Sequence, residues 1–249
     1  MRSPTLRVAT WNVGGIVGPV SLVRTLRDTV AAHRFDLLAM QEFPFSQDSD
    51  GALPEAALAI GLPCNYGWPL SASHRSNYER LGLAILSRYP IARSKKTVFP
   101  NEKSSVRRTY GEKWSDHDKG LLETTLLIDS QTMIFGTAHL PPFHRLGREG
   151  TDPEFAPVWE VLAQSMNSAA KYPSVFAGDF NTEHLSQLFR RHSVSDTFTV
   201  LINRATRPSG KKHDNIVCSS HWVHGGIHIL PSASNHHICV ADIALSKQY

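Results

Sequence analysis

Short hydrophobic runs that end in a polar residue recur along this chain. Runs of this length, rich in branched and aromatic residues and bounded by turn-forming residues, are typical of buried β-strands. The runs predicted as strands are residues 6–12, 36–42, 81–86, 121–128, 132–139, 175–179, 214–219 and 238–245. A turn at Gly225 and Gly226 is expected to separate two further short strands.

Other segments show the spacing of helices instead. Ser21 is a candidate N-cap, and Leu22, Leu26 and Val30 follow it as one apolar stripe. The predicted helices are residues 21–34, 54–60, 153–171 and 183–192. Because strands outnumber helices and helices occur in both halves, the pattern predicts an α/β sandwich in which helices cover two packed sheets.

A polar and basic segment, residues 95–119, interrupts the strand pattern and is expected to form a long hairpin or loop. It carries Lys103, Arg107, Arg108 and Lys113. Such a charge cluster is either a solvated face or an electrostatic lip for a phosphate-rich ligand, and the sequence leaves both open.

Length and composition narrow the class of protein. The 249 residues, 41% of them hydrophobic, can bury a large core, and no linker-like tract divides them, so one domain over residues 1–249 is expected. No apolar stretch reaches membrane-spanning length, and the early strand leaves no room for a signal peptide. Three scattered cysteines suit a reducing compartment, so a cytoplasmic protein is expected. A monomer is expected as well. The net charge of +4 is compatible with an anionic substrate but does not require a polymer.

The most informative stretch is residues 175–182, where an apolar run ends at Gly178 and is followed by Asp179 and Asn181. As a buried strand, it delivers an acid and an amide to the mouth of a loop, and alternation points both side chains the same way. A carboxylate beside a carboxamide can hold a water or a phosphate near a hard cation. The alternative is an ordinary turn, since these residue types all favour turns.

Polar residues at the ends of several predicted strands support the functional interpretation. Each of them alone has a structural explanation as a turn residue, a surface acid or a satisfied histidine. Together they provide a metal site and an acid/base pair. The set is Asn12, Glu42, His139, Asp179, Asn181, Asp214 and His236.

Short blocks around these residues resemble, in order and spacing, the signatures of the endonuclease/exonuclease/phosphatase superfamily. The blocks are Thr10-Trp11-Asn12, Met40-Gln41-Glu42, Ala84-Ile85-Leu86-Ser87-Arg88-Tyr89-Pro90, Thr137-Ala138-His139-Leu140, Gly178-Asp179-Phe180-Asn181, His213-Asp214-Asn215-Ile216 and Ser234-Asn235-His236. The resemblance spans nearly the whole chain. It implies a DNase I-like four-layer αββα sandwich with two mostly antiparallel sheets.

The resemblance also implies roles for individual residues. Glu42 would bind a divalent cation, Mg²⁺ or else Mn²⁺, with Asn12 and Asn235 close by. Asp179 would orient or deprotonate the attacking water, and Asn181 would hold a phosphate oxygen. His236, paired with Asp214, would donate to the phosphate, and His139 would do likewise from the other side. A substrate rim is expected from Arg107, Arg108, Arg145 and Arg148.

One position departs from the family pattern, because Asn235 stands where the closing motif has an aspartate. An amide removes one negative charge near the metal and cannot take a proton. An engineered inactivating change, a natural variant with altered metal use and a degenerate non-enzyme all remain open. An alignment shifted to His237 is disfavoured, because the spacing from His236 to the last strand is kept.

The sequence therefore predicts a Mg²⁺-dependent phosphoester hydrolase that acts on a diester rather than a monoester. Its partner would be a phosphoester substrate, with nucleic acid as one candidate. The alternatives are a phosphomonoesterase for a small metabolite or inositol phosphate, and a phosphate-binding protein that has lost turnover through Asn235. Membership of a superfamily does not choose the substrate.

Overall fold

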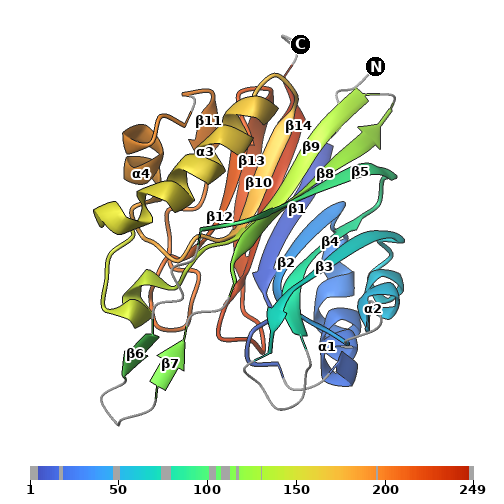
Figure 1. Ribbon diagram of the computed structural model, residues 1–249. Helices are drawn as coiled ribbons and strands as arrows, with labels where there is room; N and C mark the ends of the chain where they lie inside the picture. Colours follow the sequence, from blue (N-terminus) through green and yellow to red (C-terminus); the bar gives the residue numbers. More distant parts are fainter. Residues whose placement is uncertain are drawn as a thin grey trace.

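Two six-stranded sheets form the centre of the computed structural model (Figure 1). The structure describes residues 5–16, 19–46, 51–73, 80–100, 105–107, 113–115, 118–129, 131–194 and 196–246. The first sheet has the order β13 (Trp222–Leu230), β14 (Ile238–Leu245), β1 (Thr5–Asn12), β2 (Leu37–Phe45), β4 (Arg80–Ser87), β3 (Cys64–Ala72). The second has the order β11 (Phe198–Val200), β12 (Asp214–Ser219), β10 (Ser174–Asp179), β9 (Gln131–His139), β8 (Gly120–Ile128), β5 (Ile91–Val98).

Each sheet is antiparallel except for one central parallel pair, β1 with β2 and β9 with β10. The two strands of a parallel pair end at the same edge of their sheet. The polar residues at the ends of β1, β2, β9 and β10 are therefore brought together in pairs by the topology. Gly178 allows this in the second sheet, because a Cβ there would lie 2.0 Å from the carbonyl oxygen of Ala138.

Helices flank both sheets, with α1 and α2 on one side and α3 and α4 on the other (Figure 1). The helical elements are α1 (Pro19–Thr25), η1 (Leu26–Val30), η2 (Ala31–His33), α2 (Leu53–Ala59), η3 (Phe143–Leu146), η4 (Pro153–Phe155), α3 (Ala156–Ala169) and α4 (Leu185–Arg191). The predicted four-layer αββα sandwich is confirmed.

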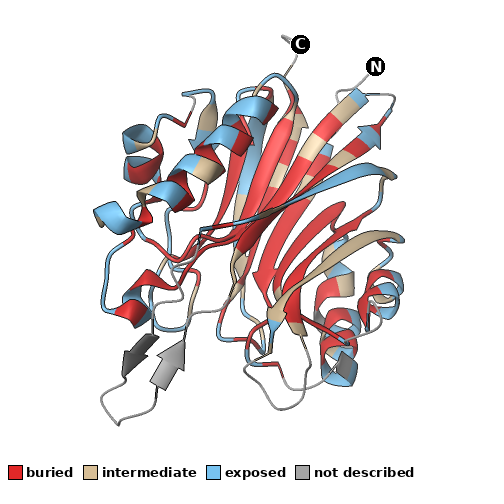
Figure 2. Cartoon of the chain, in the orientation of Figure 1, coloured by how far each residue is buried: buried red, intermediate tan, exposed pale blue. Residues whose placement is uncertain are grey.

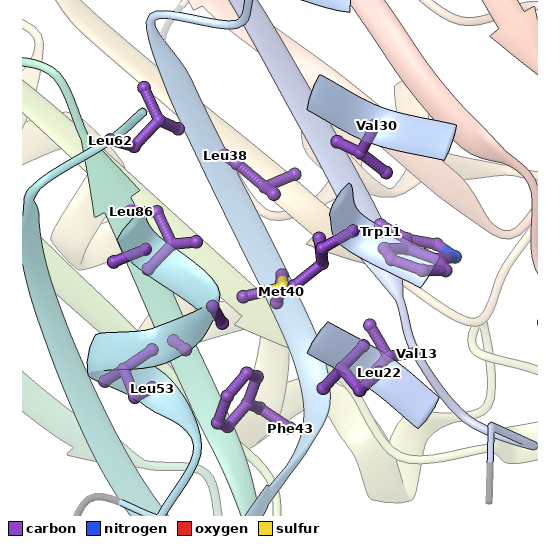
Figure 3. Close-up of a cluster of buried hydrophobic side chains, with 14 of the residues drawn as sticks. Trp11, Val13, Leu22, Val30, Leu38, Met40, Phe43, Leu53, Leu62 and Leu86 are labelled. Atoms are coloured by element: carbon purple, nitrogen blue, oxygen red, sulfur yellow. The ribbon is translucent and has the colours of Figure 1, made fainter. Parts of the chain in front are cut away.

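Three buried hydrophobic clusters correspond to the three spaces between the four layers. The first lies between the first sheet and α1 and α2, where Trp11 and Met40 meet Leu22 and Leu53 (Figure 3). The second lies between the two sheets, and the third lies between the second sheet and α3 and α4. Both central sheets are thus buried on two faces, which explains the continuous hydrophobic runs of their strands (Figure 2).

Several elements differ from the sequence prediction. The segment predicted as helix 21–34 begins at Pro19 and changes from α-helix to a π-helical turn and then a 3₁₀ turn. The glycines at 225 and 226 do not end a strand, because β13 runs through them with a register shift between His224 and Ile227. This correction has a simple cause, since glycine marks a β-bulge as readily as a turn.

Three strands, β3, β5 and β11, have no counterpart in the prediction. All three lie at sheet edges, and their residues are mostly half-buried or exposed. They therefore lack the continuous hydrophobic run that marks a central strand. Of the predicted hairpin over 95–119, the structure shows β5 ending at Val98 and a short antiparallel pair, β6 (Ser105–Arg107) with β7 (Lys113–Ser115).

Candidate active site

The candidate site lies at the end of the layer between the two sheets. On β10, Ala177 belongs to the inter-sheet cluster, so strand alternation gives Asp179 the same face. On β12, Ile216 belongs to that cluster, and Asp214 shares its face by the same rule. His139 ends β9 directly opposite Asp179 in the parallel register. The alternation that places hydrophobic residues between the sheets thus also places the Asp179 and Asp214 side chains on the inter-sheet face.

Buried hydrogen bonds join the two sheets beneath these residues. The amide nitrogen of Gln41 on β2 donates to the hydroxyl of Thr10 on β1 at 3.1 Å and to that of Thr137 on β9 at 2.8 Å. All three side chains are fully buried. Buried polar groups that are fully paired fix one arrangement of their surroundings, so this bridge holds the two sheets in register under the site.

Glu42 reaches the site through a β-bulge in β2. In a regular strand residues 40 and 42 share a face, but here Met40 and Phe43 both lie in the cluster beneath the helices (Figure 3). The register with β4 shifts between Gln41 and Phe43, and Glu42 has a φ of 54°. Glu42 is thereby released from the helix side, and its Oε1 lies 3.4 Å from the amide nitrogen of Asn12. A left-handed backbone at a charged residue is uncommon and tends to occur at functional sites.

Asp179 is the hub of the site. Its Oδ2 accepts a hydrogen bond from Asn12 Nδ2 at 3.0 Å and lies 3.7 Å from Nε2 of both His139 and His236. Its Oδ1 accepts the backbone N–H of Asn181 at 3.0 Å. The side chain is almost fully buried. The carboxylate is therefore held in one orientation between two imidazoles.

His236 is backed by a second buried carboxylate. Its Nδ1 lies 2.9 Å from each oxygen of Asp214, as the closing and penultimate blocks predict. The Thr206 hydroxyl donates to Asp214 Oδ2 at 2.7 Å, and the backbone N–H groups of His213 and Asp214 donate to that hydroxyl. Because Asp214 accepts at Nδ1, the Nε2 nitrogen of His236 is the one directed at Asp179.

His139 has the opposite environment. The Lys119 ammonium lies 3.3 Å from Nε2 of His139. Burial, and then the charge of Lys119, lower the pKa of His139 to about 3. At neutral pH this imidazole is uncharged, and the positive charge on its side of Asp179 belongs to Lys119.

The pKa of His236 moves the other way. Burial alone would lower it, but the Asp214 and Asp179 carboxylates outweigh burial and raise the pKa of His236 above its usual value. The pKa values of the two histidines beside Asp179 are therefore shifted in opposite directions, and the protonated, donating form is favoured at His236.

Asn181 follows β10 in a left-handed conformation, with a φ of 51°. Its Nδ2 donates to the Leu140 carbonyl at 2.9 Å, which ties the loop after β10 to the loop after β9. An amide nitrogen carries two protons, so one N–H remains for another acceptor. Asn12 is oriented differently, because its Oδ1 accepts the Gly14 N–H at 2.8 Å while its Nδ2 faces both acids. Asn12 thus links Glu42 to Asp179 rather than offering an oxygen to a cation.

The closing motif is fastened to the end of β1. The Ser234 hydroxyl lies 2.7 Å from the carbonyl oxygens of both Asn12 and Gly14, and Asn235 donates its N–H to the Gly14 carbonyl at 3.3 Å. The Asn235 side chain itself is exposed, and its Oδ1 lies 3.4 Å from the Ser234 hydroxyl. The backbone of the motif is therefore bonded to the end of β1 beside the site, whereas the side chain of Asn235 is exposed to solvent.

The predicted rim is only partly in place. Arg145 lies exposed on η3, and Arg148 is exposed and paired with Glu154 at 3.3 Å. Arg107 belongs to β6, and its side chain lies outside the described residues, as does Arg108 as a whole. The binding roles expected for these four arginines remain predictions.

Sequence reasoning missed several residues that complete the site, namely Thr206, Lys119, Asp118 and Ser71. Thr206 orients Asp214, and Lys119 sets the charge state of His139. Asp118 and Ser71 line a cavity of about 20 Å³ together with Glu42. Lys119 could have been found from the hairpin register, since extending the β8–β9 pairing places Gly120 opposite His139.

The donor atoms fit a hard divalent cation. Glu42 and Asp118 contribute carboxylates to the small cavity, and the Asp179 carboxylate is linked to Glu42 through Asn12. Oxygen donors of this kind are the ligands that Mg²⁺ prefers. Asp179, Asp214 and His236 also lie close enough together to share an ion. Asp214 and His236 already hydrogen-bond to each other, so the position between Asp179 and Glu42 suits a divalent cation better.

The model of the endonuclease/exonuclease/phosphatase family matches residues 9–236. The chain belongs to this family. The family match includes every residue described above at the hub of the site, from Asn12 to His236. The comparison with curated proteins finds no match.

Solved structures of family members share the fold at low sequence identity. An endonuclease/exonuclease/phosphatase from Beutenbergia cavernae has a TM-score of 0.70 at 17% identity, over 99% of this chain and 72% of the other. The human Nocturnin catalytic domain with bound sulfate has a TM-score of 0.71 at 17% identity, over 99% and 95%. A mannosyl-6-phosphatase from Bacteroides thetaiotaomicron has a TM-score of 0.66 at 11% identity, over 96% and 100%. In the described part of this family member, no helix combines the length and apolar character needed to cross a membrane.

Proposed function

We propose that this protein is a divalent-metal-dependent phosphoester hydrolase, with Mg²⁺ as the expected ion and a phosphodiester as the preferred substrate. The observation that carries the proposal is the Asp179 carboxylate held between the His139 and His236 imidazoles, with the Glu42 carboxylate joined to it through Asn12. Membership of the family supports the same chemistry, as do the names of the similar phosphatase and of Nocturnin with its sulfate.

The reaction requires a placed water, neutralised phosphate oxygens and a stabilised leaving group. Asp179, locked by Asn12 and the Asn181 N–H, orients the water and takes its proton as the new P–O bond forms. The bond from phosphorus to the leaving oxygen then breaks, and that oxygen takes up a proton. A cation held by Glu42 would neutralise charge on the phosphate oxygens.

His236 is the donor to the phosphate in this scheme. Its raised pKa keeps the imidazolium populated near neutral pH, and Asp214 fixes which nitrogen faces the reacting group. Asn181 offers its remaining amide N–H to a phosphate oxygen. Because His139 is neutral, the Lys119 ammonium supplies positive charge on the opposite side.

The test is release of p-nitrophenol from bis-p-nitrophenyl phosphate across a Mg²⁺ titration, with EDTA as the baseline. We expect Mg²⁺-dependent turnover, and we expect Glu42→Gln to need a much higher Mg²⁺ concentration. Glu160→Gln is the matched control, because Glu160 is an exposed acid on α3 away from the site. Unaltered Mg²⁺ dependence in Glu42→Gln would remove Glu42 from the cation site.

The amide at 235 supports a second candidate function. A protein that keeps the phosphate pocket but turns over poorly would bind phosphate esters without hydrolysing them. Calorimetric binding of a phosphodiester, without Mg²⁺- or Mn²⁺-dependent hydrolysis of bis-p-nitrophenyl phosphate or plasmid DNA, would favour this candidate.

A further inference from the structure

Four basic side chains gather beside the hub of the site, and we call them the basic cluster: His144, Arg207, Lys211 and His213. The rings of His144 and His213 are 5.0 Å apart. The guanidinium Nη1 of Arg207 lies 3.3 Å from Nδ1 of His213. Lys211 closes the tight turn that carries Arg207, and its carbonyl accepts the Arg207 N–H at 3.1 Å.

The basic cluster is attached to the catalytic elements. His213 directly precedes Asp214, and its carbonyl accepts the N–H of Phe180 in the loop after Asp179 at 2.8 Å. Arg207 donates from Nε to the Asn235 carbonyl at 3.4 Å, next to His236. The cluster therefore lies beside the hub, although its members come from two separate segments, the one after β9 and the one between β11 and β12.

Nearby acids offset the positive charge of this cluster only in part: the Asp179 carboxylate acts on His213, and Glu183 Oε1 accepts the backbone N–H of Lys212 at 3.3 Å. None of the ion pairs seen in the described part of the chain includes any of its four members. Burial, and after it the nearby positive groups, lower the pKa of His144. Burial is also the first cause of the lowered pKa of His213, where Arg207 and Lys211 act against the pull of Asp179. A cluster whose cations have no ion-pair partner in the described part of the chain attracts anions.

His213 supplies a directed donor to the basic cluster. Its side chain is only 3% exposed. Since the Arg207 guanidinium can only donate, Nδ1 of His213 accepts, and the ring proton of the neutral form lies on Nε2. No described residue accepts a hydrogen bond from this Nε2. An anionic oxygen between His213 and His144 would accept this N–H.

We propose that the basic cluster binds a second phosphate group of the substrate, close to the phosphoester that the Asp179 site hydrolyses. This assignment rests on the proposed function and names its substrate class, a phosphoester that carries another phosphate nearby. A nucleoside bisphosphate and a terminally phosphorylated dinucleotide share this chemistry. Arg207 and Lys211 supply charge, and His213 Nε2 supplies a directed hydrogen bond that selects a bound position.

Binding in the absence of turnover tests the cluster separately from catalysis. Calorimetry on the full chain in EDTA compares adenosine 3′,5′-bisphosphate with adenosine 5′-monophosphate. We expect the bisphosphate to bind about 10- to 100-fold more tightly, as one or two charge-assisted hydrogen bonds would give. Arg207→Gln and His213→Gln should each reduce this ratio toward one. The melting temperature of each variant shows whether it is folded. Because Arg207 is only half-buried, Arg207→Gln is expected to fold and provides the test even if His213→Gln unfolds.

Arg204→Gln is the matched control, because Arg204 is an exposed arginine in the same loop and the change removes the same charge. A ratio near one in the unaltered chain would overturn the proposal. So would an equal fall of the ratio in Arg204→Gln and Arg207→Gln, which would indicate a diffuse field instead of a site.

Turnover is measured in a separate arm, with Mg²⁺, on a thymidine dinucleotide with and without a terminal phosphate and on bis-p-nitrophenyl phosphate. A higher kcat/KM for the terminally phosphorylated dinucleotide, lost in Arg207→Gln, supports the assignment for a diester substrate. No hydrolysis of any of the three would contradict the proposed function, while the binding ratio would still decide the basic cluster.

Discussion

His139 and His236 lie at equal distances from one carboxylate oxygen, yet their surroundings drive them in opposite directions. Each Nε2 is 3.7 Å from Asp179 Oδ2, and both side chains are about equally buried. His236 has Asp214 behind it, and His139 has Lys119 beside it. The pKa of His236 is raised, whereas that of His139 falls to about 3.

The difference shows that burial and the shared carboxylate do not decide the charge of these imidazoles. Burial disfavours the imidazolium at both positions, and Asp179 favours it at both. The charged neighbour of each ring is what differs, since Asp214 contacts Nδ1 of His236 and Lys119 lies beside Nε2 of His139. The Asp214 side of the site therefore favours a protonated ring, and the Lys119 side holds an ammonium beside a neutral ring. Changing each neighbour should have a different consequence.

Removing the charge that both histidines share should have the largest effect. Asp179→Asn keeps the size of the side chain but cannot accept a proton from water, so we expect kcat to fall by up to roughly 10⁴-fold. The measurement is Mg²⁺-saturated hydrolysis of bis-p-nitrophenyl phosphate, with the melting temperature as a check on folding. A folded Asp179→Asn variant with kcat close to that of the unaltered chain would remove Asp179 from the reaction.

Removing the Asp214 carboxylate should lower the pKa of His236, as the pKa of His139 is lowered. Asp214→Asn removes the carboxylate that raises the pKa of His236, so that pKa should fall. Because the protonated ring is the donor, the alkaline limb of the kcat profile should move to lower pH, with a loss of about 10- to 100-fold near neutral pH.

Asp242→Asn is a matched control, because Asp242 also lies near a histidine, with His228 Nε2 3.6 Å from its Oδ2, but on the partly exposed β13–β14 pair. It should leave the pH profile in place. A profile for Asp214→Asn that keeps its alkaline limb would mean that His236 is not the titrating donor.

Lowering the pH should reduce the folding stability of the protein, because the pKa of His139 beside Lys119 is lowered in the folded chain. In the unfolded chain His139 titrates near 6.5, while in the folded chain its pKa is about 3. Between these values the unfolded state binds the proton and the folded state does not, so folding stability falls as the pH drops through this window. The shift implies a loss of up to a few kcal/mol near pH 4, measured by urea unfolding in EDTA.

Lys119→Met should weaken this acid dependence, because it removes the second cause of the lowered pKa of His139. His228→Gln is the comparison, since His228 is a half-exposed histidine on the β13–β14 pair, away from Lys119. If Lys119→Met and the unaltered chain lose stability alike between pH 7 and pH 4, Lys119 does not set the charge of His139.

The sequence predicts the acids and histidines of the hub because strand alternation governs them. Asp179 and Asp214 share faces with the buried residues two positions away, and a period of two is visible in the sequence. The contrast between the two histidines could not be predicted that way. Lys119 and Thr206 become neighbours of the site through pairing and turns, and no local pattern marks them.

The backbone at Glu42 illustrates the same limit. The Met40-Gln41-Glu42 block identifies the acid, but a regular strand would turn it toward the helices with Met40. The bulge that redirects it rests on a left-handed φ and on Phe43 taking the buried position. Similarly, the edge strands β3 and β5 have too little buried surface to leave a strong hydrophobic pattern.

The smallest effect is expected from Asn235→Asp, at the exposed residue that directly precedes His236, and this change should raise activity. An added carboxylate next to His236 would favour its imidazolium and strengthen cation binding. The exposed side chain at 235 contacts the Ser234 hydroxyl, and the backbone of the motif is already fastened to Asn12 and Gly14. We therefore expect a gain of about 10-fold, the lower end of the effect of an outer partner, with an unchanged melting temperature in EDTA. The measurement is kcat over a Mg²⁺ titration, side by side with the unaltered chain. Equal rates at saturating Mg²⁺ would show that the site works around the amide and that Asp214 and Asp179 set the charge of His236 without a carboxylate at 235.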